Sequence, residues 1–167
     1  MLASLTAQLK ESRHLSPDQI TEVIEQLISG DIEPAPKAEF LAALAQKGET
    51  IEEIAAFAKI LREKSIQPPI SEACRQDEIL DVCGTGGDHQ NTFNISTTVA
   101  IVAAAAGITV AKHGNRAITS KSGSADVLEA LGIRIDLTPE ETASSLEENG
   151  FAFFFAQKYH PVFKNIG

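Results

Sequence analysis

The sequence predicts an α/β protein in which a small all-helical domain precedes a parallel sheet with crossover helices. Three observations lead to this fold class. Apolar residues follow helical spacing up to about residue 65, residues 66–70 (Ile-Gln-Pro-Pro-Ile) form a stiff connector, and short apolar runs then alternate with helical segments. Such alternation is typical of parallel strands joined by right-handed crossovers. We therefore expect a helical domain at residues 1–66 and the first part of an α/β domain at residues 70–167.

Two capping boxes predict where helices of the first domain begin. Residues 16–19 (Ser-Pro-Asp-Gln) and 50–53 (Thr-Ile-Glu-Glu) each place a hydroxyl three residues before a Gln or Glu. Weaker patterns predict helices over Leu2–Arg13 and Ala38–Gln46. Helices of this length depend on packing an apolar face against something larger. We therefore expect the second domain or another subunit to cover them.

The second domain shows four short apolar runs and three helical segments. The fourth run is apolar throughout, as burial on both faces of a parallel sheet requires. Ligands of such sheets bind in the loops that leave the carboxyl ends of the strands. The expected strands are Ile79–Cys83, Ile108–Ala111, Ile133–Leu137 and Phe151–Ala156, and the expected helices are Ile95–Ala106, Ser124–Leu131 and Pro139–Glu148.

A glycine-rich loop leaves the first of these strands. Residues 81–88 read Asp-Val-Cys-Gly-Thr-Gly-Gly-Asp, and closely spaced glycines let backbone amides approach a ligand. The helix that follows begins near residues 94–97, where free amides and the positive dipole end favour an anion. The carboxylate of Asp88 suits a divalent cation or a sugar hydroxyl. The loop alone does not distinguish a phosphate site from an ordinary glycine-rich turn, because its sequence matches neither the Walker loop nor the dinucleotide-binding GxGxxG pattern.

A second loop, residues 112–124, leaves the next strand at the same edge of the sheet. It carries three cationic side chains and several hydroxyls. Lys112 and Arg116 can pair with phosphate oxygens, and the hydroxyls can complete the binding site. Two such loops at one edge favour a phosphorylated ligand over a solvated basic turn.

Composition excludes several other classes of function. The net charge of −9, with no concentrated cationic face, argues against nucleic-acid binding. No run approaches the ~20 apolar residues that span a bilayer, and the first residues lack a signal-peptide pattern. Cys74 and Cys83 have no metal or redox spacing. We expect a cytoplasmic protein.

Four motifs in order resemble the anthranilate phosphoribosyltransferase family. They are residues 84–88 (Gly-Thr-Gly-Gly-Asp), 92–97 (Thr-Phe-Asn-Ile-Ser-Thr), 112–117 (Lys-His-Gly-Asn-Arg-Ala) and 122–132 (Ser-Gly-Ser-Ala-Asp-Val-Leu-Glu-Ala-Leu-Gly). The resemblance covers essentially the whole chain. It implies a fold like that of the nucleoside phosphorylases, and transfer of the phosphoribosyl group from phosphoribosyl pyrophosphate to anthranilate in tryptophan biosynthesis. It further implies Mg²⁺ and a homodimer formed through the helical domain.

The resemblance also implies roles for individual residues. Ser96 would touch a magnesium ion, Gly84 and Asn115 would lie near anthranilate, and Tyr159 and His160 would lie close to the acceptor channel. No general base or other catalytic residue is assigned. The residues implied to bind phosphoribosyl pyrophosphate are Gly84, Gly87, Asp88, Thr92, Asn94, Ile95, Ser96, Thr97, Lys112, His113, Gly114, Asn115, Arg116, Ala117, Ile118, Thr119, Ser120 and Ser124.

The match to the family runs out at Gly167. Members of the family continue, and the further part supplies an arginine for the anthranilate carboxylate and an Asp-Glu pair for magnesium. We therefore expect a partial copy of a longer enzyme that is inactive alone. One alternative is a pyrimidine nucleoside phosphorylase, although the phosphate loops of that family have different sequences. The others are a non-catalytic nucleic-acid-binding relative and a dimerisation module.

Overall fold

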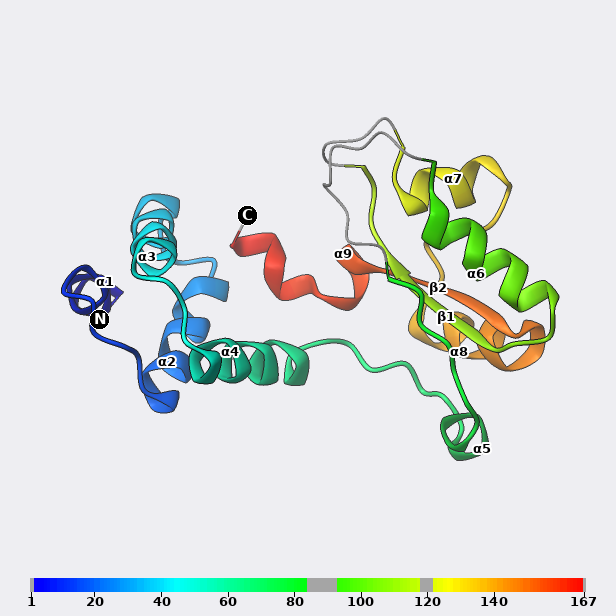
Figure 1. Cartoon of the computed structure of the whole chain (residues 1–167), viewed down its shortest axis with the longest axis horizontal. Coiled ribbons are helices and arrows are strands. Elements are labelled where there is room, and N and C mark those ends of the chain that lie inside the picture. The colour runs from blue at the N-terminus through cyan, green and yellow to red at the C-terminus, as the bar shows by residue number, and fades with distance from the viewer. Residues whose placement is uncertain (1, 84–92, 118–121, 167) are drawn as a thin grey trace. The chain divides into compact units, whose positions relative to one another are not determined.

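The computed structural model describes residues 2–83, 93–117 and 122–166. The chain divides into two compact units, one made of residues 1–65 with 160–167 and the other of residues 66–159. The first unit is helical and the second contains a parallel sheet with helices (Figure 1). The fold class predicted from the sequence is therefore confirmed.

The helical unit contains α1 (Leu2–Lys10), α2 (Pro17–Ile28), α3 (Pro34–Lys47), α4 (Ile51–Glu63) and the 3-10 turn η1 (Pro161–Asn165). In this unit α1 packs against α3, and α2 packs against both α4 and η1. Helical spacing therefore brings one apolar stripe from each of the first three helices into a common core. Its larger buried members are Leu5, Leu9, Ile20, Val23, Ile24, Leu27, Phe40 and Leu44.

Both predicted capping boxes form. Ser16 Oγ accepts the N–H of Gln19 at 3.3 Å, and Gln19 Oε1 accepts the N–H of Ser16 at 2.9 Å. Thr50 and Glu53 make the same reciprocal pair at 3.2 and 2.8 Å. The third helix begins at Pro34, earlier than predicted, because proline is well suited to the first position of a helix.

Glu53 also lies at the centre of a buried polar cluster. Its carboxylate accepts the N–H of Leu15 at 2.8 Å and pairs with the Lys47 ammonium at 2.6 Å, and both charged side chains are only 1% exposed. Burial by itself would raise the pKa of Glu53. The bonds from Leu15, Lys47 and Thr50 outweigh it and hold the pKa below its ordinary value. The cluster fastens the chain before α2 to the start of α4.

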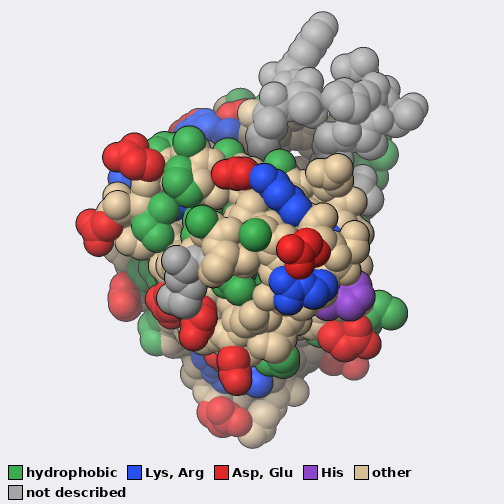
Figure 2. Space-filling model, turned by 90° about the vertical axis from the view of Figure 1, so that its left-hand side faces the viewer, with side chains coloured by type: hydrophobic (Ala, Val, Ile, Leu, Met, Phe, Trp, Pro, Cys, Tyr) green, Lys and Arg blue, Asp and Glu red, His purple; other side chains and the backbone are tan. Residues whose placement is uncertain are grey.

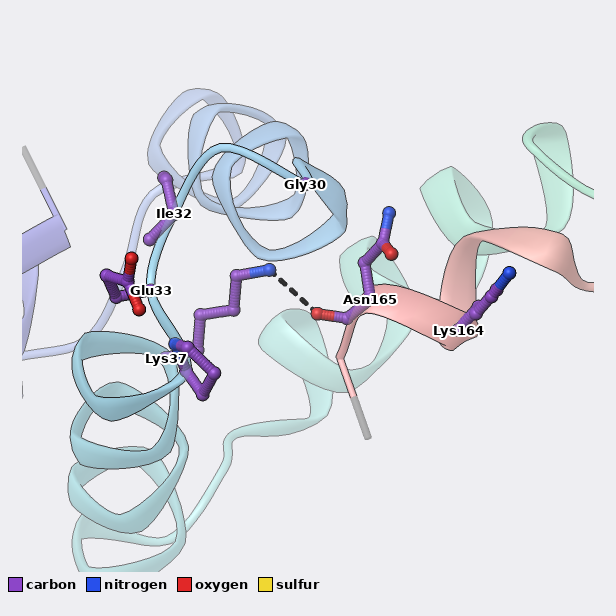
Figure 3. Close-up of a pocket in the computed structure, with 7 residues that line it drawn as sticks. Gly30, Ile32, Glu33, Lys37, Lys164 and Asn165 are labelled. Carbon is purple, nitrogen blue, oxygen red and sulfur yellow. Dashed lines mark hydrogen bonds between the residues drawn. The ribbon is translucent and has the colours of Figure 1, made fainter.

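Residues 160–166 return to the helical unit, whereas the sequence analysis assigned them to the α/β domain. The ammonium of Lys37, a buried residue, donates to the carbonyl of Ser29 at 2.6 Å. It also donates to the carbonyl of Asn165 at 2.7 Å (Figure 3). The Asn165 side chain donates to Ile28 O at 2.8 Å. A cation is favourable at the carboxyl end of a helix, so Lys37 joins η1 to the end of α2.

The α/β unit is built around strand β1 (Val110–Gly114). It pairs in parallel with β2 (Phe151–Phe155), with Val110 opposite Phe151 and Gly114 opposite Phe155. On its other side Leu80 forms a parallel bridge with Val110. Strand β1 is therefore central among the described residues. The helices of this unit are α5 (Glu72–Gln76), α6 (Ile95–Ala105), α7 (Ser124–Ala130), α8 (Pro139–Asn149) and α9 (Ala156–Tyr159).

The helices cover the sheet with apolar side chains. Helices α6 and α7 contact each other, and α6 packs on β1 while α8 packs on β2 (Figure 1). Leu128 of α7 and Phe153 of β2 share one buried cluster. The predicted helix starts at Pro139 and Ser124 agree with α8 and α7.

The prediction of a strand over Ile133–Leu137 is wrong, because these residues form no strand. The segment alternates in polarity, with Ile135 buried and its neighbours Arg134 and Asp136 exposed. Ile135 packs into the cluster around Leu128 and Phe153, so its burial needs no strand pairing. Both sides of β1 are already occupied, by Leu80 and by β2.

We predict that the free energy of unfolding decreases when the pH is lowered and Glu53 becomes protonated. A carboxylate whose pKa is lowered by folding stabilises the fold above its unfolded pKa, ~4.3, and this contribution is lost as pH falls through the lower folded pKa. Glu53→Gln should cost about 3 kcal/mol at pH 7, because it leaves Lys47 buried without a counter-charge. Urea unfolding at pH 7 and below pH ~4 measures both effects.

Glu39→Gln is the matched control for this prediction. Glu39 pairs with Lys10 at 2.6 Å, the same distance as the buried pair, but its side chain is 60% exposed. This variant should change stability little, because exposed ion pairs contribute little. A Glu53→Gln variant as stable as the wild type at pH 7 would contradict our account of the buried cluster.

Candidate functional site

Two segments of the chain leave the sheet at its carboxyl edge. Because Leu80 and Val110 pair in parallel, the chain leaves this edge after Cys83 on one side and after Gly114 on the other. Of the residues expected at the donor, seven lie outside the described part of the chain. They are Gly84, Gly87, Asp88, Thr92, Ile118, Thr119 and Ser120.

Lys112 is a buried cation at this edge. The residue is 1% exposed, and its ammonium donates to the carbonyl of His113 at 2.7 Å. It forms no ion pair with a carboxylate of the described residues. Burial lowers the pKa of Lys112, while the nearby Cys83 and Asp81 act in the opposite direction. A buried ammonium without a bonded carboxylate favours an arriving anion, because a low-dielectric site strengthens their attraction.

The start of α6 faces the second loop. The Asn94 side chain makes no cap for its own helix. Instead its amide donates to the carbonyls of Ser122 at 3.2 Å and Gly123 at 2.9 Å. This contact joins the helix that follows the glycine-rich loop to the end of the loop that follows β1. The two regions predicted to bind one ligand therefore touch.

The first turn of α6 has polar groups that a ligand could use. Backbone N–H groups of a first turn have no partner within the helix. Thr97 is fully buried, and its hydroxyl has no hydrogen-bond partner among the described residues. Ser96, half-buried, lies beside it. A buried hydroxyl without a partner is costly, so Thr97 is suited to a ligand oxygen.

Arg116, expected to bind phosphate, is paired with two carboxylates in this structure. Its guanidinium bonds to Glu129 at 2.7 and 3.0 Å and to Asp126 at 3.0 Å. It also lies 5.9 Å from the centre of the Phe155 ring. The bonds to Glu129 and then Asp126 raise the pKa of Arg116 further above its ordinary value. These bonds use three of the five N–H donors of the guanidinium, so its charge is already paired with carboxylates.

Asn115 connects the second loop to α9. Its side-chain oxygen accepts the N–H of Arg116 at 2.8 Å and lies 3.5 Å from Nε2 of Gln157. The sequence analysis did not single out Gln157. Tyr159, expected near the acceptor, is buried, with its ring 5.0 Å from that of Phe154, and burial raises its pKa.

Asp126 is the second polar residue that the sequence analysis missed. Its Oδ2 accepts the N–H of Gly123 at 2.7 Å and of Ala117 at 3.0 Å. The bonds from Gly123 and Ala117, followed by that from Arg116, hold the pKa of Asp126 below its usual range. Asp126 stands three residues after Gly123, the spacing at which the acidic member of a capping box accepts the first N–H. This spacing was the signal in the sequence that could have identified Asp126.

Glycine is required where the loop closes on itself. A Cβ at Gly123 would lie 2.3 Å from the Ala117 nitrogen and 2.5 Å from the Arg116 carbonyl carbon. A Cβ at Gly114 would lie 2.9 Å from both the Phe153 ring and the Ser124 Cβ. The loop therefore returns so closely that only hydrogen fits at Gly123.

The described residues do not form a metal site from protein ligands alone. Among residues 2–83, 93–117 and 122–166, no three His, Cys, Asp or Glu side chains converge in this way. Ser96 could contribute one hydroxyl oxygen, which is compatible with Mg²⁺ because this ion is commonly held by one or two protein groups together with substrate phosphates. Two cavities, of about 250 and 310 Å³, are lined by residues of the helical unit and not by the residues expected at the donor.

The chain belongs to the glycosyl transferase family: the model of the family's helical bundle domain matches residues 3–65, and that of its a/b domain matches residues 76–167. No helix of the described residues is both long and apolar enough to cross a membrane.

Relatives of known name are anthranilate phosphoribosyltransferases. The chain is 43% identical to that of Persephonella marina, over 99% of this chain and 48% of that protein. The solved Thermus thermophilus structure matches with a TM-score of 0.84 at 39% identity, over 98% of this chain and 48% of that one. The Saccharomyces cerevisiae enzyme in complex with PRPP and Mg matches with a TM-score of 0.84 at 31% identity, over 99% and 49%. The chain spans about half the length of these relatives.

We predict that Gly123→Ala is destabilising. The added Cβ would overlap backbone atoms that cannot rotate away, so the loop must shift, at a cost of about 2 kcal/mol or more. Gly30→Ala is the matched control, because its Cβ would meet no atom within 4 Å. The control should remain within about 0.5 kcal/mol of the wild type. Equal losses in the two variants, measured by urea unfolding, would show that the loop is not closed as described.

Proposed function

We propose that this chain binds phosphoribosyl pyrophosphate as part of an anthranilate phosphoribosyltransferase of tryptophan biosynthesis. One observation carries the proposal. The ammonium of Lys112 is buried without a carboxylate partner among the described residues, next to a loop that Asn94 joins to the start of α6. An anion placed there would meet a desolvated cation and the free amides of a helix. The named relatives support the choice of substrate class.

The reaction requires the departing pyrophosphate to be stabilised. Breaking the bond at the anomeric carbon builds positive charge on the ribose ring and negative charge on pyrophosphate. Lys112 and the first-turn amides of α6 would stabilise that negative charge in a site from which water is largely excluded. Thr97 would orient a phosphate oxygen with its buried hydroxyl. Mg²⁺, with Ser96 as a protein ligand, would supply further charge neutralisation.

Attack by anthranilate then depends mainly on alignment. Its amine is already nucleophilic, so positioning of the reactants can replace a strong base. Asn115, at the carboxyl edge of β1, is our candidate for the acceptor side. We propose that the 167 residues alone bind the sugar donor without turnover, because the chain spans about half the length of its named relatives.

We also propose that two copies pair through the helical unit. A groove of about 310 Å³ opens there between α2, α3, α4 and η1, and Ile54, which lines it, is 56% exposed.

Acidic and basic side chains are interspersed on the face in Figure 2. This mixture gives little support to nucleic-acid binding. A cytoplasmic location remains a prediction from the sequence.

We predict that Lys112→Met weakens the binding of phosphoribosyl pyrophosphate with Mg²⁺ about 10- to 100-fold, because methionine keeps much of the buried volume and removes the charge. Titration calorimetry on the purified chain measures the affinity. Lys10→Met is the control, since Lys10 pairs with Glu39 on the surface of the helical unit. Unchanged affinity in Lys112→Met, with the fold intact, would contradict the proposed site.

A further inference from the structure

One carboxylate closes the base of the loop that follows β1. Oδ2 of Asp126 accepts backbone N–H groups from Ala117 at 3.0 Å and Gly123 at 2.7 Å, at opposite ends of the loop. Its other oxygen accepts from Arg116 at 3.0 Å. A single side chain therefore holds the backbone at Ala117 and at Gly123, together with the guanidinium of Arg116.

Asn94, the residue before α6, also binds the base of this loop. Its amide donates to the carbonyl of Gly123, whose N–H is already bound to Asp126. Both backbone polar groups of Gly123 are thus occupied by side chains from two different helices. Gly123 also lies against the backbone at Ala117 and Arg116, so the base of the loop has little freedom to open.

The charge arrangement explains how a carboxylate can stand near an anion site. An uncompensated Asp126 would repel a phosphorylated ligand. The guanidinium of Arg116 lies against Asp126 and is held in place by Glu129. The two backbone amides add further positive ends of dipoles. Asp126 can therefore organise the loop at little electrostatic cost to the ligand.

We propose that Asp126 is a positioning residue for the sugar donor. It closes the loop before binding, and so holds Asn115 and the adjoining backbone next to Asn94 in the arrangement that receives the phosphorylated sugar. A loop ordered in advance loses less conformational freedom on binding, which strengthens affinity without a direct contact. This inference rests on the proposed function of the chain.

The competing explanation is that Asp126 only caps α7. Glu141 offers a direct comparison, because it occupies the same place in α8: it accepts the N–H of Thr138 at 2.8 Å and pairs with Arg134 at 3.2 Å. Asp126 makes an additional bond, to Ala117, which lies outside its helix. A cap alone does not require that bond.

The test compares Asp126→Asn with Glu141→Gln. We expect Asp126→Asn to bind phosphoribosyl pyrophosphate with Mg²⁺ about tenfold more weakly, because charge-assisted bonds to the loop are lost, and Glu141→Gln to bind like the wild type. Affinities are measured by calorimetry at a temperature where unfolding shows each chain fully folded. A residue that only caps α7 would lower the unfolding temperature and leave this affinity unchanged, which would overturn the inference.

A second measurement needs no variant. In the wild-type chain without ligand, the amides of Ala117 and Gly123 should already be protected from hydrogen exchange, and the donor should change their protection less than twofold. Rapid exchange in the free chain, with protection only after the donor is added, would contradict a loop closed in advance. If the wild type binds no donor in calorimetry, the proposed function and this inference both fall. If it binds and Asp126→Asn binds equally well, only the inference falls.

Discussion

The parallel pairing of β1 is the constraint on which the candidate site depends. With Leu80 on one side and β2 on the other, β1 is fixed so that the chain leaves the sheet at one edge both after Cys83 and after Gly114. The register with β2 then brings Phe155 and the turn after it to the same edge, where Gln157 approaches Asn115. A shift of the register by one residue would move every side chain of β1 to the opposite face, Lys112 included.

Two cationic side chains at this edge differ in whether a carboxylate pairs with them. Arg116 is neutralised by Asp126 and Glu129 and braces the loop, whereas Lys112 is buried without a bonded carboxylate among the described residues. This difference makes the proposed anion site compatible with a net charge of −9. Binding of this type depends on one desolvated charge and oriented amides rather than on the charge of the whole surface.

Local features were predictable from the sequence, and contacts across the fold were not. The capping boxes at residues 16–19 and 50–53 form as predicted, because both partners lie within one helical turn. The strand predicted at residues 133–137 does not form. The alternation of polarity indicates that Ile135 is buried, but it does not indicate which residues Ile135 packs against. Pairing of strands is decided by neighbours that are distant in the sequence.

The candidate site shows the same division. That Lys112 and Asn94 stand at the carboxyl edge of the sheet followed from the order of strands and helices, although the structure places Lys112 within β1 and not in the loop after it. The engagement of Arg116 by Glu129 did not, because a basic loop next to an acidic helix gives no sign of which charges pair. The role of Asp126 was missed because its bond to Ala117 joins residues on opposite sides of a loop.

The central claim is that both loops contact one phosphorylated sugar. Titration of phosphoribosyl pyrophosphate with Mg²⁺ into the ¹⁵N-labelled chain, followed by amide resonances, tests it most directly. The account predicts that the amides of Ser96 and Thr97 at the start of α6 and those of His113 and Asn115 after β1 shift together, with one dissociation constant. A response confined to one of the two regions, or two different constants, would contradict it.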